Sequence, residues 1–228
     1  MSIVVLFCPV AYQSEKRQNA QEVALRVLAA APKDVTPLAL GFKGEKVHPL
    51  VQSLNLPYLA ILKKDSKALL GNDRNLPYIK EVLEVGAKVN CEKFGYINSD
   101  IILPNEAVSQ LREDHNAFIF SRLEVGEISF QDFMKGEVKI LKGDNKHQGA
   151  DGFFFKKDWW ERNSFQFPDE LVLGATEWDT CYRFIIKKTC SNYIETRVLY
   201  HILHQQSWTT KTPDAVNNIS IWNSLKNR

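Results

Sequence analysis

Three polar side chains, Asn98, Ser99 and Asp100, interrupt an otherwise apolar segment at residues 94–103. On a strand, residues 98 and 100 point to the same face, so Asn98 and Asp100 can meet one ligand together. In an open α/β sheet, ligands bind beyond the carboxyl ends of the strands. A carboxylate there can hold Mg²⁺ or Mn²⁺, which in turn binds a diphosphate. The competing interpretation is a strand-to-turn cap, in which Asp100 binds nearby backbone amides.

A second candidate residue is Asp151, which lies among the small residues of segment 149–152, directly before three phenylalanines. Small residues let a ligand approach the backbone closely. The carboxylate of Asp151 can accept hydrogen bonds from sugar hydroxyls. An ordinary turn before an edge strand is the alternative, and on this segment alone it is the favoured one.

Two acids, Glu177 and Asp179, stand at the start of a predicted helix, shortly after Gly174. Either ionised carboxylate, facing a cleft, could deprotonate an acceptor hydroxyl, and the spacing does not choose between them. Thr176 and Asp179 also resemble a helix-capping pair, with Asp in place of the usual Glu or Gln. In that interpretation the role of Asp179 is structural.

His201 and His204 have the HxxH spacing. On a helix, this spacing would place both imidazoles on one face. The preceding residues, 194–203, are typical of a strand, on which positions 201 and 204 point in opposite directions. We therefore expect only one of the two histidines to reach a given metal or phosphate, and a lone histidine is more often structural.

Other residues suit ligand binding less specifically. Arg74 lies in a turn before a predicted helix, and a guanidinium beside a helix N-terminus suits a diphosphate, although the same residues suit a plain helix entry. Tryptophans can stack on sugar rings, but a place in the core is the default for each of them. The tryptophans in question are Trp159, Trp160, Trp178 and Trp208.

The elements that would position these residues alternate between strand and helix in the first half of the chain. Strands are predicted at residues 3–7, 34–40 and 58–62, and helices at 18–30 and 77–89. This alternation implies an α/β fold with a largely parallel sheet. The second half is less regular, with strands predicted at 117–122, 153–155 and 194–203, helices at 176–188 and 217–228, and an exposed loop or hairpin at 135–147.

Composition excludes several classes of protein. The 228 residues carry a formal net charge of only +2, which argues against a general nucleic-acid binder. The four cysteines form no CxxC pair, so a cysteine-based zinc site is not expected, and reduced thiols in a cytoplasmic protein are the simplest interpretation. The apolar runs are far shorter than the roughly 20 residues of a membrane span. The N-terminal run lacks the flanking features of a signal peptide.

In their order along residues 3–210, these segments resemble a glycosyltransferase of the GT-A fold. The sequence Tyr-Ile-Asn-Ser-Asp-Ile looks like the DxD motif in a variant form, in which Asn98 replaces the first Asp and Asp100 keeps the last. Segment 149–155 looks like the glycine-containing acceptor and sugar segment. Segment 174–179 is similar to the Gly-x-x-acid-Asp stretch that carries the catalytic base in inverting members. His201 and His204 follow the last strand, where many members place a metal-binding histidine.

The resemblance implies a single GT-A-like α/β domain over residues 1–228, with a mostly parallel central sheet flanked by helices. Residues 1–104 would be the nucleotide-binding half and residues 105–228 the acceptor and catalytic half. The activity would be that of a metal-dependent, hexosyltransferase-like enzyme that uses a nucleotide-diphosphate sugar and Mn²⁺ or Mg²⁺. The acceptor would be a glycan, a lipid-linked molecule or a protein. No nucleic-acid partner and no transmembrane segment are expected.

On the donor side, the resemblance implies that Asp100 binds the diphosphate through a divalent cation, and that His204 or His201 completes the metal shell. Arg74 would assist from the other side. The usual base-binding Asp near the first strand is missing, and Tyr12 stands in that region, where it could stack on uracil or another base. Asn98 and Ser99 belong to the same donor-binding motif as Asp100.

On the acceptor side, the resemblance implies that Asp151 contacts the donor sugar or the acceptor. Asp179 or Glu177 would be the catalytic base if the reaction inverts the anomeric centre.

Two alternatives to a glycosyltransferase remain open. A nucleotidyltransferase has a related fold but typically carries a glycine-rich phosphate loop, and residues 9–17 contain no glycine. A non-catalytic sugar-binding or partner-binding domain with a decayed site would explain Asn98 in place of the first Asp.

Overall fold

The computed structural model describes residues 1–12, 14–71, 73–141, 149–204 and 209–227. Within these ranges, eight strands form one sheet in the order β3-β2-β1-β4-β7-β6-β8-β5. The strands are β1 (Ile3–Phe7), β2 (Val35–Phe42), β3 (Tyr58–Leu62), β4 (Lys93–Ile97), β5 (Ile101–Ile102), β6 (Ala117–Val125), β7 (Gly152–Lys156) and β8 (Tyr193–Ile202).

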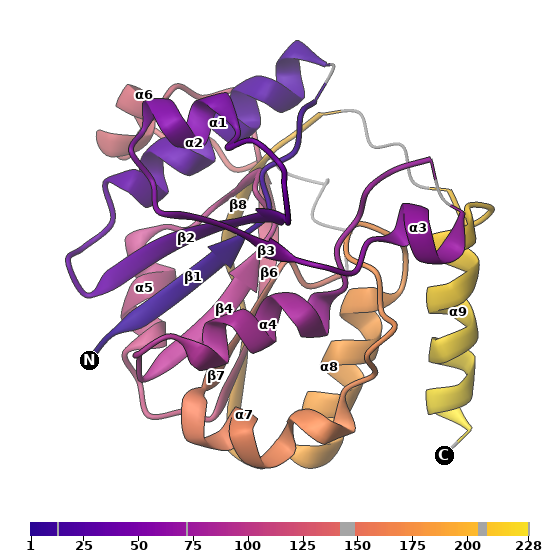
Figure 1. The fold of residues 1–228 in the computed structure, drawn as a ribbon. Helices are drawn as coiled ribbons and strands as arrows, with labels where there is room; N and C mark the ends of the chain where they lie inside the picture. Colours follow the sequence, from indigo (N-terminus) through magenta and orange to yellow (C-terminus); the bar gives the residue numbers. More distant parts are fainter. Residues whose placement is uncertain (13, 72, 142–148, 205–208, 228) are drawn as a thin grey trace.

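The helices lie on both faces of this sheet and at one side of it (Figure 1). They are α1 (Glu15–Ala29), α2 (Pro49–Ser53), α3 (Ser66–Leu70), α4 (Ile79–Lys88), α5 (Asn105–Leu111), α6 (Phe130–Met134), α7 (Lys157–Asn163), α8 (Trp178–Thr189) and α9 (Pro213–Lys226), with a short 3₁₀ helix, η1 (Ser164–Gln166), after α7. The C-terminal helix α9 stands beside α8 and α3 (Figure 1). No helix in the described part of the chain has the length and apolar character needed to cross a membrane.

The sheet is mixed, so the prediction of a mostly parallel sheet is wrong. β1 pairs in parallel with β2 and β4, β2 with β3, and β6 with β8. β7 is antiparallel to both β4 and β6, and β5 is antiparallel to β8. The sequence pattern of β7 could not reveal its direction, because a strand covered on both faces is apolar whichever way it runs. Because β7 is antiparallel to both neighbours, β4 and β6 run in the same direction.

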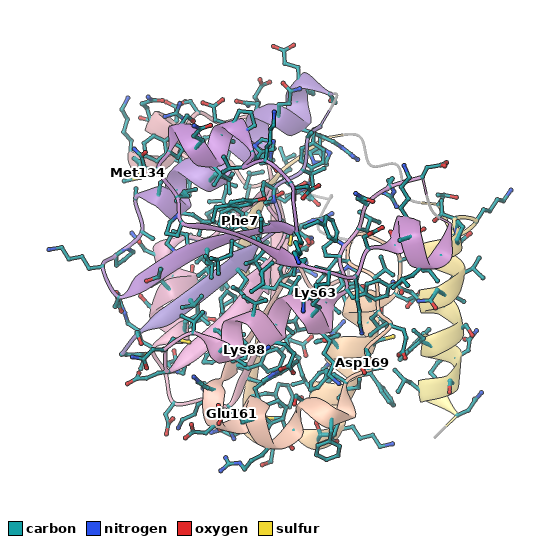
Figure 2. All side chains as sticks on the ribbon, viewed as in Figure 1. Phe7, Lys63, Lys88, Met134, Glu161 and Asp169 are labelled. Carbon is teal, nitrogen blue, oxygen red and sulfur yellow. The ribbon has the colours of Figure 1, made fainter. Side chains whose placement is uncertain are left out.

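Each buried strand supplies side chains to two cores, one on either face of the sheet. In β1, Val4 and Leu6 join the core under α4, α7 and α8, whereas Ile3, Val5 and Phe7 join the core under α1, α2 and α5. This alternation is why the apolar run of β1 is unbroken. Figure 2 shows Phe7 inside the fold and Met134 at its periphery, in agreement with exposures of 0% and 58%.

A β-bulge in β8 sets its register against β6. Ser121 pairs with Arg197, but Arg122 pairs with Leu199, so Val198 is an extra residue in β8. Beyond this bulge, Glu124 pairs with His201. A shift of one residue turns every following side chain to the other face of a sheet. The bulge therefore brings His201 to the same face as Glu124, and re-aiming a side chain is a common role of bulges near functional sites.

A buried lysine at the start of β4 gives a first testable expectation. Lys93 is 2% exposed, and its ammonium donates to the carbonyl oxygen of Leu111 at 2.8 Å and to that of Glu113. Leu111 ends α5, so the cation stabilises the C-terminus of that helix. Because Lys93→Met removes this donor from both carbonyls, we expect it to lower the free energy of unfolding by about 1–3 kcal/mol.

Urea denaturation measures this loss. The matched control is Lys88→Met, which makes the same change at an exposed position near the end of α4. Equal denaturation midpoints for Lys93→Met and the unmodified protein would contradict a stabilising role for Lys93.

Candidate functional site

A cavity of about 910 Å³ lies at the edge of the sheet where β1, β2 and β4 end. These three strands are parallel, so their carboxyl ends meet at one edge, which is where ligands bind in α/β folds. Further lining residues come from β6, from the end of β8 and from the loop before α8. The site residues predicted from the sequence that line this cavity are Tyr12, Arg74, Asn98, Ser99, Asp100, His201 and His204.

Asp100, His201 and His204 form a cluster in which one possible ligand atom from each lies within 4.8 Å of the others. Asp100 Oδ2 lies 3.3 Å from His204 Nε2 and 3.8 Å from His201 Nε2, and the two Nε2 atoms are 3.1 Å apart. The expectation that the two histidines point in opposite directions is wrong. β8 ends at Ile202, so strand alternation no longer controls where His204 points.

The antiparallel pairing of β5 with β8 explains why Asp100 joins this cluster. Ile101 pairs with His201, so the residue before Ile101 lies next to that histidine. Burial acts to raise the pKa of Asp100, but the neighbouring imidazoles of His201 and His204 outweigh it and hold the pKa well below its usual range. Burial acts to lower the pKa of His201, but the carboxylates of Asp100 and Glu124 outweigh it and raise the pKa to about 8. Asp100 is therefore ionised at neutral pH.

The donor set of the cluster fits a divalent transition metal. It offers one carboxylate oxygen and two imidazole nitrogens. Mg²⁺ is bound by oxygen ligands in a demanding octahedral geometry, whereas first-row transition metals such as Mn²⁺ also accept imidazole nitrogen. Of the two ions expected from the sequence, Mn²⁺ is therefore the better match to these residues.

Asn98 is not part of this cluster, and its side chain forms hydrogen bonds with other residues at the edge of the sheet. Its amide donates to Asp151 Oδ1 at 3.1 Å, and the hydroxyl of Tyr96 donates to its carbonyl oxygen at 3.2 Å. Asp151 is 3% exposed and forms an ion pair with Arg122 at 2.9 Å. Burial raises the pKa of Asp151, and the guanidinium of Arg122 partly offsets that rise. Asn98 and Asp100 thus point to different partners, although both line the cavity.

A second cavity, of about 270 Å³, adjoins the first. The two cavities share Asn98, Ala175 and Thr176 in their linings. The remaining predicted site residues, Asp151, Glu177 and Asp179, line the second cavity. The structure therefore groups the residues expected to bind the nucleotide diphosphate and metal around one cavity, and the candidate bases together with Asp151 around its neighbour.

The start of α8 differs from the capping arrangement that the sequence suggests. The N-cap is Glu177 and not Thr176, and its φ of 69° is in the left-handed region. Such a backbone is uncommon for a residue other than glycine and is found most often at functional sites. Asp179 Oδ2 accepts a hydrogen bond from the backbone N–H of Ala150 at 3.1 Å. Asp179 thus connects the first turn of α8 to the segment that carries Asp151.

Arg74 and Tyr12 both line the larger cavity. The guanidinium of Arg74 forms a 3.0 Å ion pair with the buried Asp214 at the start of α9 and is 51% exposed, so part of it is open to a ligand. Tyr12 lies under the guanidinium of Arg17, which is 5.6 Å from the ring centre. Burial raises the pKa of the Tyr12 hydroxyl, and the negative charge of Asp100 adds to the rise.

Ser99 fixes the loop around Asp100. Its hydroxyl donates to Gln21 Oε1 at 2.8 Å in a buried position. The same Gln21 side chain also bonds the backbone N–H and C=O of Val10, both at 2.9 Å. One side chain of α1 therefore connects the loop after β1 to the turn after β4.

The aromatic candidates and the residues that the sequence missed can also be placed. Trp159, Trp160 and Trp178 are buried in the core, and Trp208 lies outside the described residues. The missed residues near the site are Arg17, Arg122 and Glu124. The sequence contains a signal for the last two, because charged residues at the end of an apolar strand are the same pattern that singled out residues 98–100. Arg17 Nε donates to His204 Nδ1 at 3.3 Å, and no local pattern indicates this long-range contact.

No protein-family model and no curated protein matches the sequence. Among solved structures, residues 1–349 of S. aureus TarS match with a TM-score of 0.52 at 10% identity, over 89% of this chain and 60% of that chain. A longer S. aureus TarS chain matches with a TM-score of 0.51 at 13% identity, over 89% of this chain and 37% of that chain. The protein thus spans less than two thirds of either TarS chain.

A glycosyltransferase involved in the glycosylation of the major capsid of PBCV-1 matches over 90% of this chain and 95% of its own, with a TM-score of 0.46 and 10% identity. At such low identity, structural likeness shows the fold alone. The two TarS matches cover most of this chain. Over that length, the chain has the fold of S. aureus TarS.

Proposed function

We propose that the protein is a GT-A-type glycosyltransferase that moves a sugar from a nucleotide-diphosphate donor to an acceptor hydroxyl with the help of a divalent metal. The observation that carries this proposal is the meeting of Asp100, His201 and His204 in the larger cavity, at the carboxyl edge of a glycosyltransferase fold. A carboxylate with two histidines suits a divalent cation, and the cavity beside it has room for a nucleotide-sugar.

The larger cavity is the proposed donor site. Asp100, His201 and His204 would hold Mn²⁺, which neutralises charge that develops on a leaving diphosphate. The half-exposed guanidinium of Arg74 adds positive charge to the same cavity. The ring of Tyr12 offers a stacking surface for the base of the donor. These residues recognise an anionic diphosphate joined to an aromatic base.

The smaller cavity is the proposed acceptor site. Asp179 is the stronger candidate for the catalytic base, because its carboxylate lines this cavity and is held in place by the N–H of Ala150. Glu177 lines the same cavity and remains the alternative. Asp151, held by Asn98 and Arg122, would contact the sugar or the acceptor. A base in this position serves an inverting reaction.

The same proposal assigns different functions to the two halves of the chain. Tyr12, Arg74 and the turn at 98–100 come from residues 1–104, the nucleotide-binding half of a single domain. Asp151, the two acids at the start of α8 and the two histidines come from residues 105–228, the acceptor and catalytic half. An acceptor that is a glycan, a lipid-linked molecule or a protein, and a cytoplasmic location, stay predictions from the sequence.

The proposal is tested by the melting temperature of the protein with a panel of nucleotide diphosphates and nucleotide-sugars, each with Mn²⁺, with Mg²⁺ and with a chelator. A ligand that binds only the folded state stabilises it by about 2.7 kcal/mol at about a hundred times its Kd. We expect a rise for one nucleotide class that is larger with Mn²⁺ than with Mg²⁺ and disappears with the chelator.

Release of free sugar from the donor that binds separates the competing functions. Slow, Mn²⁺-dependent hydrolysis supports a transferase, since water can replace the acceptor. Binding without any release of sugar, to water or to acceptors, favours the non-catalytic sugar-binding alternative. Release of pyrophosphate from a nucleoside triphosphate and a sugar phosphate favours a nucleotidyltransferase. No thermal shift with any member of the panel contradicts the proposed donor site.

A further inference from the structure

Two charged residues of β6, Arg122 and Glu124, are buried beside the proposed metal cluster, and the proposed reaction gives neither of them a part in its chemistry. Each is 4% exposed. Removing charges from water is costly, and a buried ion pair is often no more stabilising than apolar residues of the same volume. Stability alone therefore does not account for an arginine and a glutamate inside this sheet.

Glu124 contacts the proposed metal cluster through His201. Glu124 Oε2 lies 2.6 Å from His201 Nδ1, while Nε2 of the same ring faces Asp100 and His204. A carboxylate accepts hydrogen bonds but does not donate them when ionised, so it requires the proton of a neutral imidazole to be on Nδ1. When a metal ion displaces the proton from Nε2, the lone pair of that nitrogen points to the centre of the cluster, which is the arrangement that metal-binding histidines need.

Arg122 connects Glu124 to the other half of the site. Its Nε donates to Glu124 Oε1 at 2.8 Å, and its Nη1 donates to Asp151 Oδ1 at 2.9 Å. The guanidinium is a rigid planar fork, so it fixes the two carboxylates relative to each other. Asp151 in turn is bonded to Asn98, which lines both cavities. A continuous series of hydrogen bonds thus runs from the metal cluster to the lining of the smaller cavity.

The backbone supports the same arrangement. Glu124 pairs with His201 because of the bulge at Val198. Asp151, just before β7, continues the backbone pairing of β7 with both neighbours. The N–H of Asn98 donates to the carbonyl oxygen of Asp151, and the N–H of Asp151 donates to the carbonyl oxygen of Phe120 in β6. The positions of these side chains are therefore determined by the sheet itself.

We propose that Glu124 and Arg122 are positioning residues. Glu124 holds His201 in the orientation and tautomer that bind a metal, and Arg122 holds Glu124 while it fixes Asp151 beside the smaller cavity. This inference rests on the proposed function, because it concerns the same metal site.

The direct test is the affinity of Glu124→Gln for Mn²⁺, measured by isothermal titration calorimetry. Glutamine has nearly the same shape, but its amide can donate as well as accept, so it no longer requires the proton of His201 to be on Nδ1. Loss of such an outer partner typically weakens metal binding 10–100-fold, and we expect a loss of about that size. The electron paramagnetic resonance spectrum of bound Mn²⁺ should change as well, because one histidine is reoriented.

The matched control is Glu127→Gln, which makes the same chemical change three positions further on, at an exposed side chain. We expect its Mn²⁺ affinity to equal that of the unmodified protein. Arg122→Lys is the second variant, and it keeps every buried charge. A lysine ammonium lacks the planar fork, so this variant should also bind Mn²⁺ more weakly, and it provides the test if Glu124→Gln does not fold.

The outcomes separate the inference from the function on which it rests. If the unmodified protein does not bind Mn²⁺, the proposed metal-dependent function is wrong, and the positioning role fails with it. If the unmodified protein binds Mn²⁺ and a folded Glu124→Gln or Arg122→Lys variant binds it equally well, the positioning role is wrong while the function stands. A lower melting temperature with unchanged Mn²⁺ affinity would show that these residues serve stability alone.

Discussion

Asp100→Asn is expected to abolish Mn²⁺-dependent binding of nucleotide-sugars and, with it, sugar transfer. Among the described residues, Asp100 supplies the carboxylate of the cluster, and the two neighbouring histidines keep it ionised. An amide carries no charge and is a much weaker metal ligand. Because loss of outer-shell partners alone costs about 10–100-fold in metal affinity, loss of this direct ligand should cost at least about a hundredfold. Calorimetric titration with Mn²⁺, and then with donor in the presence of Mn²⁺, measures both effects.

The control for this substitution is Asp158→Asn, at an exposed position in α7. Its Mn²⁺ and donor affinities should not change. Metal-free Asp100→Asn should still fold, because Asp100 lies in a turn outside the two main cores. Its melting temperature should fall, because the lowered pKa of Asp100 means that the ionised carboxylate stabilises the folded state at neutral pH. Unchanged donor affinity in a folded Asp100→Asn variant would exclude Asp100 as the metal ligand.

Asp179→Asn is expected to lower the rate of sugar transfer while leaving donor binding unchanged. A general base typically contributes about 10²–10⁴-fold to the rate, so we expect a loss in kcat of that size. The substitution removes the basic carboxylate but preserves the hydrogen bond that Asp179 accepts. The side-chain oxygen of asparagine can still accept the hydrogen bond from the Ala150 N–H, so the connection between α8 and segment 149–152 is kept. The measurements are kcat for transfer, Kd for the donor and the melting temperature.

Glu177→Gln distinguishes the two candidate bases. If Asp179 is the base, Glu177→Gln should retain most of the transfer activity, and the reverse pattern would assign the base to Glu177. An Asp179→Asn variant that transfers sugar at the normal rate would exclude Asp179. A fall in melting temperature, with activity lost only in proportion to the folded fraction, would show that Asp179 has a structural role.

Local pattern was sufficient to predict much of the fold around the site. β1 and β3 span the segments predicted from their apolar runs, and α1 and α4 follow the helical spacing of their apolar residues. Polar residues at the end of a buried strand are unusual, so the sequence predicts that residues 98–100 belong to a site, and these residues line the larger cavity. Such signals come from residues close together in sequence, and each depends on the local periodicity of burial.

The remaining features depend on pairings between distant segments, which local periodicity does not contain. The direction of β7 is set by its neighbours, β4 and β6, and not by its own phenylalanines. His201 and His204 come together because β8 ends between them, and strand boundaries are the least certain part of a sequence-based prediction. Asn98 lines the larger cavity, yet the carboxylate to which its side chain donates belongs to Asp151, more than fifty positions away.

The extra residue in β8, Val198, makes the bulge a requirement of the site in a strand of this length. If β8 paired regularly with β6 beyond Ser121, Tyr200 would stand opposite Glu124 and His201 would turn to the other side of the sheet. Deleting Val198 would remove the bulge and still leave His201 opposite Glu124, whereas one further residue between Arg197 and His201 would move His201 out of that pairing. Among homologous chains, a β8 that is one residue shorter and free of the bulge should therefore keep the metal cluster, while a β8 that is one residue longer should be rare.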